Sequence, residues 1–466
     1  MLRPEIPVPP SGPVTAREIL VVVLACLALT VLFGLPWYPN PVTIPTTYQG
    51  ASQHHAHTDA GIWTFLLAWG AAHPDRFYDA PVIVPLPHPL VANDPRLTEG
   101  LWSIPLFRLF PPVLAWGLSQ WIALFTGALG AYFAGRFLFA SRWTGSAVLV
   151  LFGFGNFRAT HICHIEGTFA PFLPLVFTAM ALALDNPSRR RVVLGSFIAV
   201  MAVIEYSYTA VPLALLLPPI LFWGAWRRRY PLRRTMLVLA LSGLVIGLIL
   251  APVALLYHRF HEATLIARHG SDHNLFSADL LAWCTSPDNR VFSPFGGPGH
   301  DYFDLQLFPG FVLTTLGLIG LRGLWRRSPE ILLFGVFTFI LSFGTWRLLA
   351  WRLGLPHLDF ATPYEILSMA LLPLRAIRAP GRFAVFVHLV LAFSAGGVLL
   401  RLASRSRAWQ PLLVLLLALS FLEARAAVHP IRLLPERAGD PAFQWLAQRD
   451  ETGAVLDHPM GQHTVR

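Results

Sequence analysis

The sequence predicts an all-α polytopic membrane protein with about eleven transmembrane helices. Three observations predict this class: 55% of the 466 residues are hydrophobic and only 13% are charged, and the mean hydropathy is +0.56. A soluble domain carries about 25% charged residues. The composition therefore excludes an ordinary soluble enzyme, a disordered chain and a small disulfide-stapled secreted module.

Each predicted helix is an apolar run whose length fits, or nearly fits, the hydrocarbon core of a bilayer, which takes about 20 helical residues. The third and fifth runs are short, so the count holds to about one helix either way. The expected helices span residues 18–36, 111–135, 144–157, 168–184, 191–206, 208–225, 235–257, 308–324, 330–345, 383–400 and 409–424.

The first helix follows a polar lead and ends in Gly-Leu-Pro-Trp-Tyr without a small-residue cleavage site. We therefore expect a retained anchor and not a signal peptide. The chain then divides into a cytoplasmic segment at 1–17, a transmembrane domain at 18–424 and a short tail at 425–466. The tail ends in a strand-like run, which leaves open that the chain is a fragment of a longer protein.

The distribution of arginine predicts the orientation, because basic residues are retained on the cytoplasmic side. With the N-terminus inside, the inner segments hold 18 of the 35 basic residues but only four of the 25 acidic ones. The long loops at 37–110, 258–307 and 346–382 then lie outside, with the C-terminus periplasmic or extracellular. The inner segments then carry +14 and the outer ones −4, which together give the net charge of +10. No nucleic-acid partner is expected.

The first outer loop carries the most informative stretch. A His-rich segment ending in Asp59 precedes a Trp-rich run at 60–72 that is too short to span the bilayer, so we expect an interfacial helix there. Asp59 would stand at the N-terminus of that helix. Its role is either that of an N-cap alone or that of a general base acting on a group presented among the lipid headgroups.

The same segment contains candidate metal ligands. Imidazole and carboxylate groups bind divalent cations, so His57 and Asp59 could hold Mn, Mg or Zn. The spacing matches no strong metal-binding signature, and solvated loop histidines are the alternative. Further along the loop, Asp94 and Glu99 are candidate second acids.

Two further groups on the outer side carry polar residues beside predicted helices. Arg158, His161, His164 and Glu166 follow the third helix, and they either cap it or line a substrate cavity. His161 and His164 would share a face at helical spacing.

Arg378 and Arg382 precede the tenth helix on the outer side, where the positive-inside rule disfavours them. Guanidinium groups bind phosphate in a bidentate manner, so these residues are candidates for a lipid-linked phosphate; snorkelling to headgroups is the alternative. Within the spans the ionisable residues are few, chiefly Glu205 and His388. An ion-coupled transporter usually needs more, so we expect chemistry at the outer surface.

This pattern resembles the GT-C superfamily of integral-membrane glycosyltransferases, and more closely the bacterial YfhO-like and polyprenyl-phosphate-sugar-dependent mannosyltransferase-like membrane proteins. The resemblance covers about residues 18–400. It rests on Asp59 with the run at 60–72, Phe77-Tyr78-Asp79-Ala80-Pro81, Asp94, Asn156-Phe157-Arg158 with His161 and His164, Pro171, Pro174, and Arg378-Ala379-Pro380-Gly381-Arg382-Phe383.

The resemblance implies a hexosyltransferase in the bacterial inner membrane. It would move a sugar from a polyprenyl-phosphate carrier to an envelope glycan, lipid or protein at the outer face. Asp59 would be the base or a metal-assisted orienter of the acceptor, and Asp94 or Glu99 a second acid. Arg378 and Arg382 would neutralise the departing lipid phosphate, as preplaced donors do for developing negative charge.

Two other functions stay open. A transporter or flippase of lipid-linked glycans could use the same arginines without covalent chemistry, and a non-catalytic envelope scaffold would need only helices and a partner-binding tail. A cavity joining Asp59, Arg158 and Arg378 would favour the enzyme. A continuous polar path through the spans would favour transport.

Overall fold

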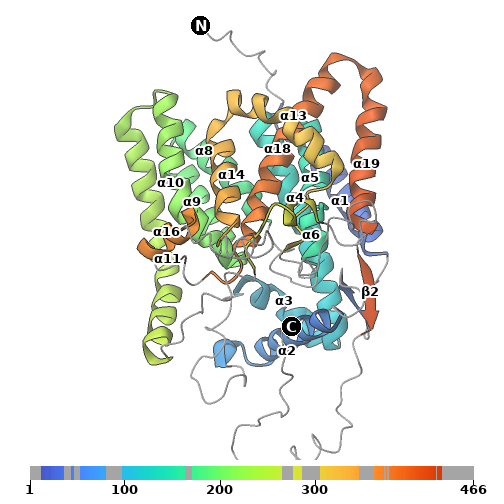
Figure 1. Cartoon of the computed structure of the whole chain (residues 1–466), viewed down its shortest axis with the longest axis vertical. Coiled ribbons are helices and arrows are strands. Elements are labelled where there is room, and N and C mark those ends of the chain that lie inside the picture. The colour runs from blue at the N-terminus through green and yellow to red at the C-terminus, as the bar shows by residue number, and fades with distance from the viewer. Residues whose placement is uncertain are drawn as a thin grey trace, which may run out of the picture.

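Helices that run alongside one another make up most of the chain (Figure 1). The computed structural model describes residues 12–35, 43–46, 53–79, 97–162, 171–264, 276–285, 305–345, 361–371, 374, 377–426 and 428–432. The bundle helices are α1 (Ala16–Gly34), α4 (Pro112–Phe139), α5 (Arg142–Leu151), α8 (Leu173–Asp185), α9 (Arg189–Glu205), α10 (Ala210–Arg227), α11 (Leu232–Thr264), α13 (Phe311–Arg327), α14 (Pro329–Ser342), α18 (Ala384–Arg405) and α19 (Gln410–Ala426).

Shorter elements join and cover these helices. They are α2 (Gln53–Ala72), η2 (Pro74–Asp79), α3 (Leu97–Leu109), α6 (Asn156–Thr160), η4 (Ser207–Thr209), η5 (Ala282–Cys284), α16 (Pro363–Ala370), η8 (Pro380–Phe383) and η9 (Arg407–Trp409). Two short strands, β1 (Thr43–Thr46) and β2 (His429–Arg432), pair antiparallel with Thr43 opposite Arg432. They join the chain before α2 to the chain after α19.

Each of the eleven predicted runs forms a helix, but the count of eleven membrane spans is not confirmed. Six helices are long and apolar enough to cross a membrane: α1, α4, α10, α11, α18 with the preceding η8, and α19 with the preceding η9. The other bundle helices are shorter; α5 has 10 residues, about 15 Å at 1.5 Å per residue. It ends at Leu151 because the chain turns at Gly153 and Gly155, so the prediction of a helix to residue 157 was wrong.

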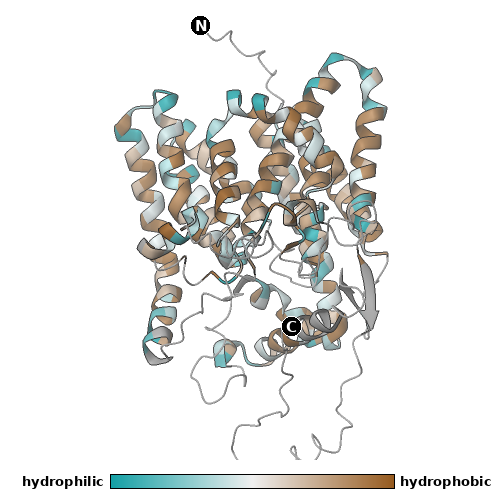
Figure 2. Ribbon diagram, viewed as in Figure 1, coloured by the Kyte–Doolittle hydropathy of each residue, from teal (hydrophilic) through white to brown (hydrophobic). Residues whose placement is uncertain are grey.

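Apolar side chains cover the outer surface of the bundle, which is the arrangement of a helical membrane protein. Figure 2 shows the middle of the long helices as hydrophobic and their ends as more polar. Large apolar residues such as Leu20, Leu248 and Val414 are more than half exposed. Water would penalise so much exposed apolar surface, whereas lipid would not.

The two ends of the bundle differ, and we call them the N-terminal end, where α1 begins, and the loop end, where α2 and α3 lie (Figure 1). At the N-terminal end the buried Glu18 carboxylate of α1 accepts hydrogen bonds from Arg136 Nε at 2.7 Å and Tyr132 Oη at 2.9 Å, both on α4. A third comes from Arg142 Nε of α5 at 2.8 Å. These bonds fix α1 against α4 and α5.

The interior of the bundle is built around α18, of which 83% is buried over its most apolar window. Small residues allow close packing there: Gly317 and Gly320 of α13 lie against Leu391 and Ser394 of α18. Ser394 donates to the Gly317 carbonyl at 2.6 Å. Because glycine has no side chain, the two backbones can approach closely, as small residues allow between membrane helices.

At the loop end, α2 lies across the ends of the bundle helices (Figure 1), the orientation expected for an interfacial helix. It begins at Gln53 and not at residue 60. The prediction that Asp59 stands at the helix N-terminus was therefore wrong. Asp59 lies inside α2, where the backbone N–H groups that a cap would accept from are already bonded within the helix.

Candidate functional site

The strongest candidate site is a buried group of charged residues at the loop end, which we call the loop-end cluster: Glu99 of α3, Arg158 of α6 and Glu205 of α9. All three side chains are buried. Glu205 interacts electrostatically with both Glu99 and Arg158. Two carboxylates therefore share a low-dielectric space with one guanidinium group, an arrangement that proteins seldom retain without a function.

Arg158 is held in place by its surroundings on three sides. Its backbone is fixed by the short helix α6, which follows the turn at Gly155. Its guanidinium lies 5.3 Å from the centre of the Phe152 ring, and it fills the space beside Gly127 of α4, where a Cβ atom would overlap it. A glycine at 127 is thus what lets the charge lie against α4.

Glu205 occupies the last position of α9, just before Tyr206 ends the helix. Its Oε2 accepts a hydrogen bond from the Phe172 backbone N–H at 3.3 Å. Its Oε1 is buried and has no hydrogen-bond partner among the residues that the structure describes. Such an oxygen costs about 1–3 kcal/mol, which binding of a ligand donor or a water would recover.

A second part of the site is basic and aromatic. Tyr206 and Tyr208 follow Glu205 directly, with ring centres 5.5 Å apart. The Arg382 guanidinium of η8 lies 4.6 Å above the Tyr208 ring. Arg378, which is exposed, lies 4.6 Å above the ring of Phe276. Cation–π contacts orient both guanidinium groups.

Two histidines form an apolar stack beside this site. The Phe157 ring lies 4.0 Å from the His161 ring and 5.5 Å from the His388 ring of α18, centre to centre. His161 Nδ1 pairs with the Phe157 carbonyl at 2.9 Å, and His388 Nε2 with the Leu307 carbonyl at 3.0 Å. These histidines join α6 to α18, which is a packing role. The helix α6 ends at Thr160 and His164 lies outside the described residues, so a shared helical face of His161 and His164 stays a prediction.

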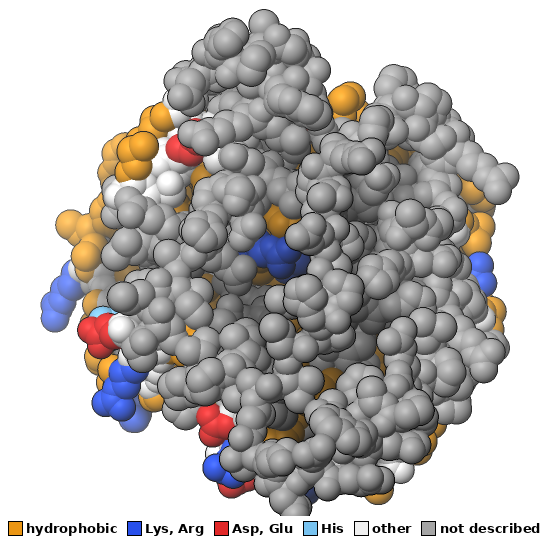
Figure 3. All heavy atoms as spheres, turned by 60° about the horizontal axis from the view of Figure 1, so that its bottom comes forward, with side chains coloured by type: hydrophobic (Ala, Val, Ile, Leu, Met, Phe, Trp, Pro, Cys, Tyr) orange, Lys and Arg blue, Asp and Glu red, His pale blue; other side chains and the backbone are white. Residues whose placement is uncertain are grey.

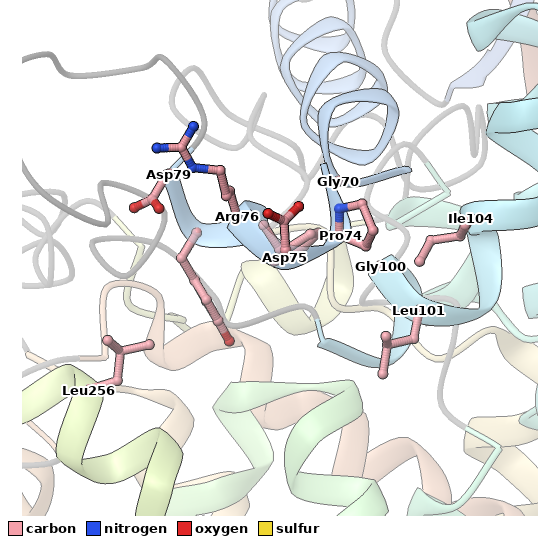
Figure 4. Close-up of a pocket in the computed structure, with 11 residues that line it drawn as sticks. Gly70, Pro74, Asp75, Arg76, Asp79, Gly100, Leu101, Ile104 and Leu256 are labelled. Carbon is pink, nitrogen blue, oxygen red and sulfur yellow. The ribbon is translucent and has the colours of Figure 1, made fainter. Parts of the chain in front are cut away.

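A cavity of about 230 Å³ also lies at the loop end, between η2, α3 and Leu256 of α11 (Figure 4). Gly70 of α2 and Gly100 of α3 leave room for the Phe77 ring, which positions η2 over α3. Asp75, Arg76 and Asp79 line the cavity beside Tyr78. Burial raises the pKa of Tyr78 to about 12, so its hydroxyl stays protonated.

The predicted site residues meet only in part. Two of the predicted residues, Glu99 and Arg158, both interact electrostatically with Glu205. The structure places Arg378 and Arg382 on the neighbouring segment before α18. The cavity of Figure 4 is lined by none of Arg158, Arg378 and Asp59. Asp94, His164, Glu166 and the side chains of His57 and Asp59 lie outside the described residues.

Basic and hydrophobic atoms lie together near the middle of the face at the loop end. Figure 3 shows them among atoms of residues that the structure does not describe. The chain contains no lysine, so the basic atoms belong to arginine.

No group of three or more His, Cys, Asp or Glu side chains that could hold a metal ion occurs in the described part of the chain. Glu99 and Glu205 alone offer two carboxylates, and metal sites of this kind generally use more ligands. The candidate ligands His57 and Asp59 stay a prediction from the sequence.

The geometry defines a helical membrane protein with a charged, arginine-containing site at one end of its bundle. No protein family, no curated protein and no solved structure matches the chain.

Proposed function

We propose that the protein is an integral-membrane glycosyltransferase that moves a sugar from a polyprenyl-phosphate carrier to an acceptor of the cell envelope. The loop end faces the outer side of a bacterial inner membrane, and the N-terminal end faces the cytoplasm. The observation that carries the proposal is the loop-end cluster beside Arg382 and Arg378. It combines carboxylates that bind hydroxyl groups with guanidinium groups that bind phosphate.

In this proposal the arginines act on the donor. A polyprenyl-phosphate sugar breaks its glycosidic bond more readily when the phosphate that leaves meets preplaced positive charge. Arg382 and Arg378 are preplaced by the rings of Tyr208 and Phe276. Guanidinium groups held in this way lose little freedom when they bind a phosphate.

The carboxylates act on the acceptor and the sugar. Glu205 Oε1 lacks a described partner and can accept a hydrogen bond from a sugar hydroxyl. Arg158 compensates the charge that Glu205 places in the interior. The base that takes the proton of the acceptor hydroxyl is Asp59, carried by the interfacial helix α2, with Glu99 or Asp94 as the second acid.

The first test of this proposal is the lipid that the protein retains. We would purify the full chain gently as wild type, as Arg378→Ala/Arg382→Ala, and as the control Arg401→Ala/Arg405→Ala, which removes two arginines from the other end of α18. Mass spectrometry of the extracted lipids should find a polyprenyl phosphate or its glycosylated form with the wild type and the control, and about tenfold less with the first variant. Equal amounts in all three would contradict the donor site.

The second test separates an enzyme from a flippase. Asp59→Asn should abolish sugar transfer while membrane insertion is kept, whereas Glu262→Gln, at an exposed acid near the end of α11, should leave transfer unchanged. Transfer at the wild-type rate by Asp59→Asn would exclude Asp59 as the base. Movement of labelled lipid-linked glycan in vesicles that survives Asp59→Asn, without sugar transfer by any variant, would favour the flippase.

A further inference from the structure

A second cavity, of about 430 Å³, lies at the N-terminal end, between α4, α8, α10 and α14. The charged residues of its lining are Asp185, Arg228, Arg327 and Glu330. Thr178, Tyr230 and Ser328 are polar, and the rest is apolar. It shares no lining residue with the cavity at the loop end. It is therefore separate from the proposed transfer site.

The charges in this N-terminal cavity balance. Two arginines face two acids. Arg228 forms an ion pair with one oxygen of Glu330, and the Tyr230 hydroxyl donates to Asp185 Oδ1 at 2.8 Å. Burial and the Asp185 carboxylate raise the pKa of Tyr230, so its hydroxyl remains a donor. A ligand with both a negative and a positive group suits such a lining better than a simple anion or cation.

Glu330 supplies the observation that calls for the positive group. Glu330 is only 6% exposed, and its Oε2 has no hydrogen-bond partner within the described part of the chain. A buried carboxylate oxygen in this state needs a donor. A primary ammonium group supplies N–H donors together with a charge, which makes the hydrogen bond stronger than a neutral one.

Arg327 supplies a place for the negative group. Its guanidinium stacks over the Phe139 ring at 5.0 Å and donates from Nη2 to the Leu138 carbonyl at 3.2 Å. These contacts hold the side chain at the wall of the cavity. A guanidinium is the cationic group whose planar N–H donors best match a phosphate.

The cavity also reaches the lipid-facing surface of the bundle. Phe137 and Leu182 line it and are 46% and 43% exposed. An acyl chain can follow these side chains from the cavity into the bilayer. This opening favours a lipid over a soluble zwitterion of the same headgroup chemistry.

We propose that this cavity binds a phospholipid with a primary-amine headgroup, such as phosphatidylethanolamine. The ammonium group donates to Glu330 Oε2, the phosphate binds Arg327 with Arg228, and the acyl chains lie along Phe137 and Leu182. Phosphatidylcholine carries a positive charge but no N–H donor. Phosphatidylglycerol has a phosphate but no positive group.

The test is native mass spectrometry of the purified full chain, titrated in detergent with dioleoyl forms of these three lipids. We expect the phosphatidylethanolamine adduct to form at about tenfold lower lipid concentration than the adducts of the other two lipids. A difference of about tenfold in affinity is what about one charge-assisted hydrogen bond provides. Glu330→Gln should remove this preference. Glu262→Gln, an exposed acid at the other end of α11, should keep it.

A second variant guards against a folding defect. Ala181→Phe fills the cavity, whose lining includes Ala181, and changes no charge. It should weaken phosphatidylethanolamine binding about tenfold even if Glu330→Gln does not fold. The inference is overturned if the wild type binds the three lipids equally, if folded Glu330→Gln keeps the preference, or if Ala181→Phe binds like the wild type. It is also overturned if glycerophosphoethanolamine competes as well as the full lipid, because the ligand would then be soluble.

Discussion

The charge balance of the loop-end cluster makes a signed prediction. Arg158→Met keeps much of the apolar length of the side chain but removes the guanidinium, and so leaves the buried Glu205 carboxylate without this counter-charge. Removing one partner of a buried ion pair costs about 3–5 kcal/mol. Glu205→Gln acts in the opposite sense, because it also removes the repulsion between the Glu205 and Glu99 carboxylates. We expect it to change the free energy of unfolding by less than about 1 kcal/mol.

The double variant Arg158→Met/Glu205→Gln should therefore be more stable than Arg158→Met alone, by about 1–2 kcal/mol, within the range of couplings between residues in one network. Unfolding in mixed micelles with increasing dodecyl sulfate, followed by the fluorescence of the 15 tryptophans, measures these differences. Arg76→Met is the matched control. Arg76 is exposed on η2, so its loss should cost no more than about 0.5 kcal/mol.

Two results would refute this reasoning. If Arg158→Met were as stable as Arg76→Met, Arg158 would not be compensating buried carboxylates. If Glu205→Gln cost as much as Arg158→Met, the Glu205 carboxylate would be a fully paired partner and its Oε1 would not be available to a ligand.

The remaining predictions concern packing and the N-terminal end. Gly127→Ala should lower the free energy of unfolding by about 1–3 kcal/mol, the cost of overpacking a filled space, because the new Cβ overlaps the Arg158 guanidinium. The control is Gly61→Ala in α2, where a Cβ meets nothing within 4 Å; it should be neutral or stabilise by up to about 1 kcal/mol. Equal effects of the two substitutions would contradict the contact between Gly127 and Arg158. Glu18→Ala should cost about 3–5 kcal/mol, since it leaves the Arg136 side chain, 4% exposed, without its carboxylate. Arg142→Ala should cost less than about 1 kcal/mol, because the Arg142 side chain is 65% exposed. All four variants are measured by the same unfolding assay. If Glu18→Ala cost as little as Arg142→Ala, α1 would be held by apolar packing alone.

Hydrophobic patterning predicted the helices well because each is a local property of the chain. A continuous apolar run forms a helix in lipid, since every backbone group must be paired there. The lengths were harder to predict. The end of α5 depends on the turn through Gly153 and Gly155, and the start of α2 at Gln53 adds a polar first third that no apolar pattern announces.

The candidate site was harder to predict because it depends on packing between distant segments. Glu99 and Arg158 were candidates for separate reasons, and Glu205 was noted as an isolated ionisable residue in a span. The sequence held one signal that they belong together: a carboxylate in an apolar helix must find a positive partner. It could not say which arginine, since that follows from how α3, α6 and α9 meet. The stacking of Arg382 over Tyr208 is non-local in the same way.

The Glu18 network and the loop-end cluster use buried charge in opposite ways, and this difference supports the loop-end cluster as the proposed transfer site. At the N-terminal end one carboxylate, Glu18, receives bonds from two arginines and a tyrosine, so its demand for donors is met within the protein. Such a group locks helices together. At the loop end Glu205 interacts electrostatically with both Glu99 and Arg158, and it keeps an oxygen without a described donor.

A chain that needed only to hold α9 in place could have replaced Glu205 by an apolar residue at little cost, because buried ion pairs add little stability over apolar packing. Retaining the carboxylate, next to a ring-stacked arginine, is reasonable when a ligand supplies the missing donor. The loop-end cluster is therefore where a substrate hydroxyl should bind. The N-terminal Glu18 network, which is already satisfied, should tolerate no ligand and affect only stability.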